Sequence, residues 1–129
     1  MMDPVVHFEM PAKDKERTAK FYSEVFGWKM QQLGAQMGDY LLAATAETDE
    51  NNMITKPGAI NGGFYQYGEA GTIPHVVIAV DDLAERMQQV AKAGGKVIGK
   101  PMDIPGIGAF VMFTDTEGNR VGMLQPLMK

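Results

Sequence analysis

An internal repeat is the feature of this sequence that most constrains its fold. Each half contains a histidine near the start of an apolar strand pattern, an aspartate suited to a helix N-cap and a glycine suited to a helix end. Adding 68 to the residue number superposes these landmarks: His7 on His75, Asp14 on Asp82 and Gly27 on Gly95. Later in each half the offset falls to 59, which aligns Gly63 with Gly122 and Gln66 with Gln125. Landmarks of different chemical kinds in one register predict two copies of the same supersecondary unit.

The first copy, residues 5–67, predicts the order strand, helix and three strands. Between Asp14 and Gly27 a helix is indicated by residues at helical spacing: Thr18, Phe21, Tyr22, Val25 and Phe26. Strand and turn signals place the strands at residues 5–10, 28–33, 39–45 and 60–67. Gly34 and Gly38 are expected in a turn, and residues 47–58 in an exposed loop.

The second copy, residues 74–126, repeats this order. A buried strand of Val and Ile follows Pro74, and the face of the next helix is formed by Leu83, Met87, Val90, Ala91 and Gly94. Further strands are expected at residues 96–99, 109–114 and 120–125, separated by a loop rich in Pro and Gly at 101–108 and a turn at 115–119. Because each copy needs a partner for its uncovered sheet face, we predict one α+β domain, residues 1–129, of two tandem βαβββ modules. Its open, cup-shaped sheet would have about eight strands.

Composition excludes several classes of function. The 129 residues carry a net charge of -4 with scattered lysines, so the chain has no basic stripe for nucleic acid. It has no cysteine, which excludes disulfides, thiolate metal sites and a thiol nucleophile. Its apolar runs are strand-sized, and its first residues lack a basic region followed by a long apolar one. We therefore expect a soluble cytoplasmic protein without a membrane partner.

Six segments, taken in order, resemble one known superfamily. They are His7–Pro11, Phe21–Trp28, Ile60–Gly63, Pro74–Asp82, Lys100–Gly106 and Asp115–Asn119. Their order and spacing are similar to those of the vicinal oxygen chelate superfamily, which includes glyoxalases, bleomycin-resistance proteins and extradiol dioxygenases. The likeness covers nearly the whole chain and points to a glyoxalase-related branch similar to lactoylglutathione lyase. It implies the glyoxalase fold of two tandem modules.

The resemblance also implies a divalent metal, Zn²⁺, Ni²⁺, Mn²⁺ or Fe²⁺, held by the first and last strands of each module. His7 and His75 match the first-strand positions, whereas Gly63 and Gly122 stand where carboxylate ligands are expected. A glycine has no side chain with which to bind a metal. A catalytic metal site normally has about three protein ligands and an open position. We therefore predict an incomplete metal site and no other cofactor.

Glu9 is the carboxylate best placed to join His7, because residues two apart on a strand point to the same face. His7, His75 and Glu9 are the candidate catalytic residues, since histidine moves protons readily near neutral pH. Each has an alternative interpretation. The histidines suit neutral, hydrogen-bonded positions inside the fold, and Glu9 suits a buried carboxylate satisfied by hydrogen bonds.

Four other polar residues are expected to be structural. Gln66 and Gln125 lie three residues past the two glycines, so without a bulge they face the opposite side of the sheet. Asp81 and Asp82 precede the second helix, where a carboxylate accepts backbone N–H groups. We expect them to act as helix caps.

The predicted substrate-binding cavity is apolar, with two tyrosine hydroxyls. Its expected lining is Trp28, Tyr40, Phe64, Tyr65, Met102, Phe110 and Met112. Apolar walls with few polar groups are typical of small-ligand sites. The loop at residues 101–108 is a candidate rim or lid, and every one of these residues also suits core packing.

Three functions are compatible with these residues. The first is a lyase or isomerase of the lactoylglutathione lyase type, or an extradiol dioxygenase, that uses a metal with a non-standard third ligand. The second is a metal-free protein that sequesters a small apolar compound, as bleomycin-resistance members do. The third is a metal-free isomerase or lyase in which a histidine moves the proton. In each case the partner is a small molecule, and exposed sheet edges together with the family habit predict a homodimer.

Overall fold

The computed structural model describes residues 2–50 and 54–127. The chain divides into two compact units. The first unit is formed by residues 7–74, and the second by residue 75 onward together with the residues before 7. Apart from residues 5 and 6, which begin the first strand, each unit contains one βαβββ module, and the predicted order of elements is confirmed in both halves. In the part of the chain that the structure describes, no helix is long and apolar enough to cross a membrane.

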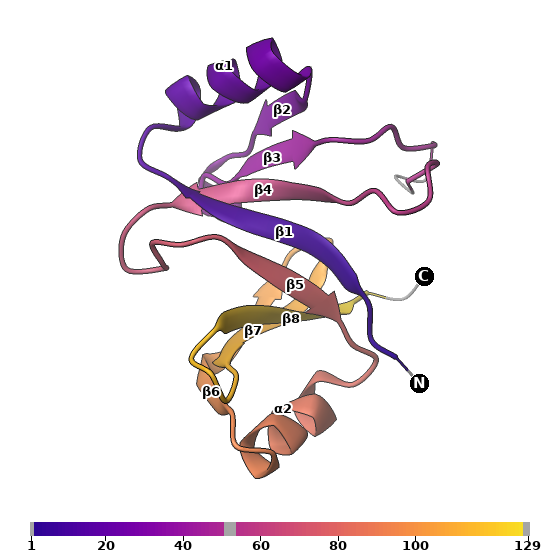
Figure 1. Cartoon of the computed structure of the whole chain (residues 1–129), viewed down its shortest axis with the longest axis vertical. Helices are drawn as coiled ribbons and strands as arrows, with labels where there is room; N and C mark the ends of the chain where they lie inside the picture. The colour runs from indigo at the N-terminus through magenta and orange to yellow at the C-terminus, as the bar shows by residue number, and fades with distance from the viewer. Residues whose placement is uncertain (1, 51–53, 128–129) are drawn as a thin grey trace. The chain divides into compact units, whose positions relative to one another are not determined.

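The first module consists of a four-stranded sheet and one α-helix (Figure 1). Its elements are β1 (Val5–Ala12), α1 (Lys15–Phe26), β2 (Lys29–Gln32), the 3-10 turn η1 (Ala35–Met37), β3 (Leu41–Ala44) and β4 (Asn61–Gln66). The strand order is β2-β3-β4-β1, with β1 parallel to β4 and the other pairs antiparallel. β1 runs two residues beyond the predicted strand, because Ala12 still pairs with Gln66.

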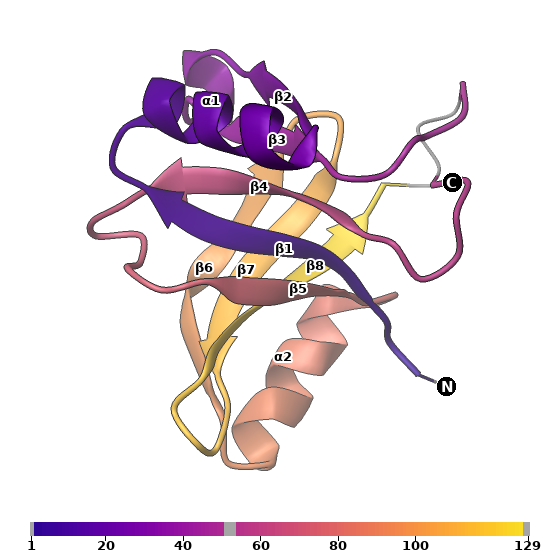
Figure 2. The same ribbon diagram turned by 45° about the horizontal axis from the view of Figure 1, so that its top comes forward.

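The second module repeats this arrangement, and Figure 2 shows α2 against one face of its sheet. Its elements are β5 (His75–Ala79), α2 (Leu83–Lys92), β6 (Lys96–Ile104), β7 (Gly108–Thr114) and β8 (Arg120–Pro126). The strand order is β5-β8-β7-β6, with β5 parallel to β8. Residues before β1 are tied to this unit, since the Ala79 N–H donates to the Pro4 carbonyl at 2.9 Å and Arg86 Nε lies 2.6 Å from Asp3 Oδ2.

Both predicted N-caps are confirmed, but the predicted equivalence of the helix ends is wrong. Asp14 and Asp82 accept hydrogen bonds from backbone N–H groups three residues on, at 3.0 and 3.1 Å. Gly27 ends α1 in the left-handed conformation, with φ of 72°. α2 is two residues shorter than α1 and ends at Ala93, so Gly94 rather than Gly95 takes the positive φ, 103°. Gly94 therefore lies outside the helix instead of on its apolar face.

The predicted loop at residues 101–108 is also wrong. Residues up to Ile104 belong to β6, where Met102 pairs with Phe110 and Ile104 with Gly108. The register of β6 on β7 shifts between Ile98 and Met102, and Gly99 takes a φ of 72°. A bulge on an outer strand accommodates Gly and Pro, so a segment rich in both remains in the sheet. Only residues 105–107 are left to connect β6 to β7, and this turn is too short to be a lid.

Each sheet packs one face against its own helix. The core of the first module is formed by Ala12, Leu41, Ala43 and Phe64, with Phe8, Met10, Ala19, Tyr22, Trp28 and Met30 packed around them. The core of the second is formed by Val80, Leu83, Val111 and Met123, with Ile78, Met87, Val90, Val97, Ala109 and Phe113 around them. Because side chains alternate along a strand, the residues between these core positions lie on the opposite face. We call this opposite face of each sheet its helix-free face.

Candidate functional site

Three polar side chains meet on the helix-free face of the first sheet. His7 and Glu9 lie on β1, two residues apart and therefore on the same side, while Tyr40 comes directly before β3. The Tyr40 hydroxyl donates to Glu9 Oε2 at 2.8 Å and lies 3.0 Å from His7 Nε2. All three side chains are half-buried. The first module thus connects a carboxylate to an imidazole through one phenol.

The phenol of Tyr40 is held in its protonated form. Burial raises the pKa of Tyr40 far above the ordinary value for a tyrosine, and the charge and hydrogen bond of Glu9 raise it further. At neutral pH the hydroxyl therefore keeps its proton and donates it to the Glu9 carboxylate. The phenol oxygen can still accept a hydrogen bond from His7.

Gly63 makes room for the ring of Tyr40. Gly63 on β4 pairs with Glu9 on β1 and with Leu42 on β3, so it lies at the centre of the same face. The three atoms that a Cβ at position 63 would meet first, Cε2, Cζ and the hydroxyl oxygen, all belong to Tyr40. The phenol thus fills the space that a ligand side chain on this strand would need, which explains the glycine in physical terms.

The second module also has a glycine covered by an aromatic ring, but this ring has no hydroxyl. A Cβ at Gly122 would lie 2.7 Å from Cε1 and Cζ of Phe110 and 3.2 Å from Cγ2 of Val77. Phe110 is two residues before Met112, the β7 partner of Gly122, just as Tyr40 is two residues before Leu42, the β3 partner of Gly63. His75 begins β5 and is half-buried. The second module therefore has an apolar ring where the first has a phenol.

These residues do not fit the metal site that the resemblance implies. The last-strand position of each module is a glycine covered by an aromatic ring. The carboxylate of Glu9 lies on the same side as His7, but its Oε2 accepts the Tyr40 hydroxyl. Within either unit of the described chain, no three His, Cys, Asp or Glu side chains gather closely enough to hold a metal ion. A catalytic site normally needs about three such ligands.

Trp28 and Phe64 do not belong to the predicted substrate site. Phe64 is fully buried in the core beneath α1, and Trp28 stacks on Tyr22 of that helix with ring centroids 4.7 Å apart. The alternation of side chains along β4 explains the error, because Phe64 is adjacent to Gly63 and must face the other way. Both residues stabilise the helix-covered side of the sheet.

The other predicted lining residues lie on helix-free faces. Tyr65 shares a face with Gly63, and its hydroxyl donates to the Ile73 carbonyl at 2.8 Å. In the second module Met112 pairs with Gly122, and Met102 pairs with Phe110 and is 60% exposed. Their predicted role in lining a ligand cavity stays a prediction.

Three of the four remaining polar candidates support the helices. Gln125 Oε1 accepts the Leu83 N–H at 2.8 Å, and Gln66 Nε2 lies 3.5 Å from the Lys13 carbonyl. Each glutamine therefore faces the start of its own module's helix, on the side opposite to the glycines. Asp82 is the N-cap of α2, whereas Asp81 is exposed just before it and makes no cap.

Asn61 has a structural role that sequence reasoning missed. It pairs with His7 across β1 and β4, and its Oδ1 accepts the N–H groups of Thr45 and Ala46 at 2.7 and 3.0 Å. These bonds hold the chain as it leaves β3. An asparagine at the first residue of a strand is the only sequence signal for this role.

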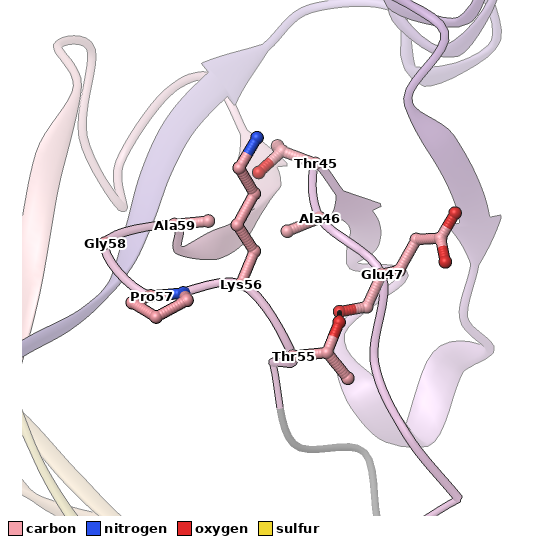
Figure 3. Close-up of a pocket in the computed structure, with 8 residues that line it drawn as sticks. All are labelled: Thr45, Ala46, Glu47, Thr55, Lys56, Pro57, Gly58 and Ala59. Carbon is pink, nitrogen blue, oxygen red and sulfur yellow. Dashed lines mark hydrogen bonds between the residues drawn. The ribbon is translucent and has the colours of Figure 1, made fainter.

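A surface pocket of about 580 Å³ lies in the loop between β3 and β4 (Figure 3). It is lined by Thr45, Ala46, Glu47, Thr55, Lys56, Pro57, Gly58 and Ala59. Figure 3 shows the Lys56 side chain extending towards Thr45, while the carboxylate of Glu47 points away from it. None of the predicted site residues lines this pocket. It belongs to the predicted exposed loop, of which residues 51–53 lie outside the described chain.

Comparisons with known proteins define the family. The model of the Glyoxalase/Bleomycin resistance protein/Dioxygenase superfamily matches residues 5–123. A glyoxylase-like domain-containing protein of Didymella fabae is 36% identical over 119 residues, which are 86% of this chain and 84% of that protein. The chain belongs to this superfamily, and the family predicted from the sequence is confirmed.

Other relatives match at lower identity or over shorter stretches. A probable lactoylglutathione lyase of Vibrio parahaemolyticus is 24% identical over 94% of this chain and 89% of that protein. The putative glyoxylase CFP32 of Mycobacterium tuberculosis is 42% identical over 52 residues, which are 40% of this chain and 20% of that longer protein.

Solved structures with low sequence identity share the fold. A methylmalonyl-CoA epimerase of Streptomyces coelicolor has a TM-score of 0.72 at 10% identity, covering 99% of this chain and 100% of that chain. A hypothetical protein of Bacillus halodurans has a TM-score of 0.70 at 14% identity, covering 100% of this chain and 98% of that chain. These likenesses confirm the predicted α+β fold class of tandem βαβββ modules.

Proposed function

We propose that this chain is a glyoxalase-like protein that binds a small organic molecule and moves a proton on it with His7, without a metal held by the last strands. One observation carries the proposal. The Tyr40 ring fills the space that a ligand side chain at position 63 would need, and its hydroxyl is hydrogen-bonded to both His7 and Glu9. The residues that would share a metal in this module are instead joined in a hydrogen-bond chain.

The hydrogen-bonded series Glu9, Tyr40 and His7 suits general acid–base chemistry. Imidazole exchanges protons near neutral pH, and a neighbouring carboxylate stabilises the charge that an imidazole gains. The names of relatives, lactoylglutathione lyase among them, support a lyase or isomerase. In such a reaction His7 would take a proton from one atom of the substrate and return it to another.

Sequestration of a small apolar compound is the second candidate. It is favoured by the second module, where Phe110 replaces the phenol and the half-buried Met112 and Leu124 share its face of the sheet. A surface of this kind binds apolar groups without reacting with them. In this alternative Tyr40, the first-module counterpart of Phe110, would supply a single polar anchor for the compound.

Metal content is the first test. Elemental analysis of protein purified without chelator should find no divalent metal in stoichiometric amount in the parent, in His7→Ala or in His75→Ala. A stoichiometric metal in the parent that disappears in either variant would overturn the metal-free proposal.

Ligand binding and proton transfer are the second test. A ligand that binds only the native state raises its melting temperature, so a thermal-shift screen of small carbonyl compounds and aromatic metabolites identifies binders. Each binder is then incubated with the protein in D2O, and exchange of its carbon-bound protons is followed by NMR. Exchange that His7→Gln abolishes supports catalysis, whereas tight binding without exchange would favour sequestration. No binder in a broad panel would contradict both.

A cytoplasmic homodimer is the assembly that we propose for this function. The family habit and exposed sheet edges support it. Exposed apolar side chains on α1 add to this support: Phe21, Val25 and Phe26 are 52%, 56% and 59% exposed. Sedimentation equilibrium at micromolar concentration should give twice the mass of the chain, and a single-chain mass would contradict the dimer.

A further inference from the structure

We infer that Tyr40 and Glu9 are positioning residues that hold a proton on Nε2 of His7, so that Nδ1 is the nitrogen that gains and loses protons. The catalytic meaning of this inference rests on the proposed function. The arrangement of the protons does not, and it can be measured without a ligand.

Counting donors and acceptors leads to this assignment. An ionised carboxylate only accepts hydrogen bonds, and a phenol has one proton to donate. The Tyr40 proton is directed to Glu9 Oε2, 2.8 Å away, so the phenol presents only lone pairs to His7. The 3.0 Å contact from His7 Nε2 to that oxygen is then a hydrogen bond only if Nε2 carries the proton. In the neutral imidazole this leaves the lone pair on Nδ1.

The backbone around Tyr40 is held firmly in place. Asp39, directly before it, has a φ of 55° and is the single non-glycine residue with positive φ among those that the structure describes. Its carbonyl accepts from Lys15 Nζ at 2.6 Å and from Gln32 Nε2 at 2.7 Å, and the Tyr40 carbonyl accepts the Leu33 N–H at 2.8 Å. A strained conformation persists only where the surroundings enforce it. Here the enforced residue, Asp39, directly precedes the residue that carries the phenol.

The second module shows that filling space does not require the hydroxyl. Phe110 covers Gly122 through the same diagonal relation across two strands. If the first module needed only an aromatic ring over Gly63, phenylalanine would serve there too. The two rings differ by one oxygen atom, and in the first module that atom is hydrogen-bonded to both His7 and Glu9.

The two histidines make the inference accessible to NMR on 15N-labelled protein. Histidine in water already favours a proton on Nε2, so the decisive readout is protection of this proton from exchange as well as its position. In the parent above the pH at which His7 becomes neutral, a slowly exchanging ring proton should be found on Nε2, with a nuclear Overhauser effect to the Tyr40 ring. His75→Gln assigns the signal to His7.

Tyr40→Phe is the test variant, because it removes the hydroxyl and keeps the ring over Gly63. We expect the protected Nε2 proton of His7 to be lost in this variant, while a thermal melt shows that the protein remains folded. Tyr65→Phe is the matched control: it removes a hydroxyl on the same face that donates to the Ile73 carbonyl, and it should leave the His7 signal in place.

Two results would overturn the inference. One is a ring proton on Nδ1 of neutral His7 in the parent, which needs no variant at all. The other is an Nε2 proton that stays equally protected in Tyr40→Phe. Failure of the proposed function looks different, since the Nε2 proton would then depend on Tyr40 as expected while no small molecule binds or exchanges protons.

Discussion

Gly63→Ala should destabilise the protein only while Tyr40 is present. A Cβ at position 63 would meet three atoms of the Tyr40 ring before any other group, the hydroxyl oxygen at 2.5 Å. The glycine is not among the residues with positive φ, so alanine adopts its backbone conformation without strain. The effect of the substitution is therefore steric, and one identified side chain causes it.

The expected magnitude comes from two opposing terms. Alanine in a strand interior is favoured over glycine by about 0.5–1 kcal/mol. Overpacking of a well-filled site costs about 1–3 kcal/mol. If the Tyr40 ring instead swings away, it loses its hydrogen bonds to His7 and Glu9, each worth about 0.5–1.5 kcal/mol and more for the charged partner. The net loss in the free energy of unfolding should be about 1–2 kcal/mol.

A double-mutant cycle tests this reasoning by urea unfolding. In a Tyr40→Ala background the clash is gone, so Gly63→Ala should become stabilising by up to about 0.5–1 kcal/mol. The coupling energy between the two sites is then about 1–3 kcal/mol. Gly122→Ala is the matched control, because its nearest neighbours are Phe110 and Val77, and its effect should not depend on Tyr40. An equal loss from Gly63→Ala in both backgrounds would refute the steric argument.

Three further predictions concern single groups. Folding raises the pKa of Tyr40, so the stability that its protonated hydroxyl contributes is present below the ordinary tyrosine pKa of about 10 and is lost as pH rises above it. Phenolate absorbance of Tyr40 should consequently appear only when base unfolds the protein, and a spectrum of four ionised tyrosines in the folded state would contradict this. Asp82→Ala removes the N-cap of α2 and should lower the free energy of unfolding in urea by about 1 kcal/mol, with a smaller loss for Asp82→Asn. Hydrogen bonds from the Asn119 side chain, and to a smaller extent from backbone N–H groups, lower the pKa of Asp115 below its ordinary value of 3.8. The stability that Asp115 contributes is therefore present above about pH 4 and is lost in acid. In Asp115→Asn the melting temperature should fall less steeply as the pH is lowered below 4. An unchanged pH dependence would argue against a role for the turn at residues 115–119.

The sequence predicted those parts of the fold that depend on local chemistry. The N-caps Asp14 and Asp82 were correct because a cap needs only its own side chain and the next turn of helix. The loop at residues 101–108 was wrong because Gly and Pro are read as turn formers, whereas a bulged outer strand also accepts them. Which of these occurs depends on pairing with β7, a long-range contact without a local signal.

The candidate site was predictable residue by residue but not as a set of contacts. His7, Glu9 and Tyr40 were each identified as polar residues of the site, since strand alternation places the first two on one face. That Tyr40 covers Gly63 depends on the register of β3 against β4, which are joined by a long loop that fixes no register. Alternation alone separates Phe64 from Gly63, so its placement in the core needed no further information.

The paired glycines and rings have a consequence for how the chemistry of this chain is divided. A carboxylate side chain at Gly63 would have to displace the Tyr40 ring, and one at Gly122 would have to displace the Phe110 ring, so in each module a ligand side chain and the ring compete for one space. In both modules an aromatic ring therefore occupies the space of a ligand side chain, and the two rings differ by one hydroxyl. Since that hydroxyl contacts both His7 and Glu9, proton transfer belongs to the first module in our proposal. The second module then contributes apolar surface, and the Phe110→Tyr variant would add a phenol there without the carboxylate that orients it in the first.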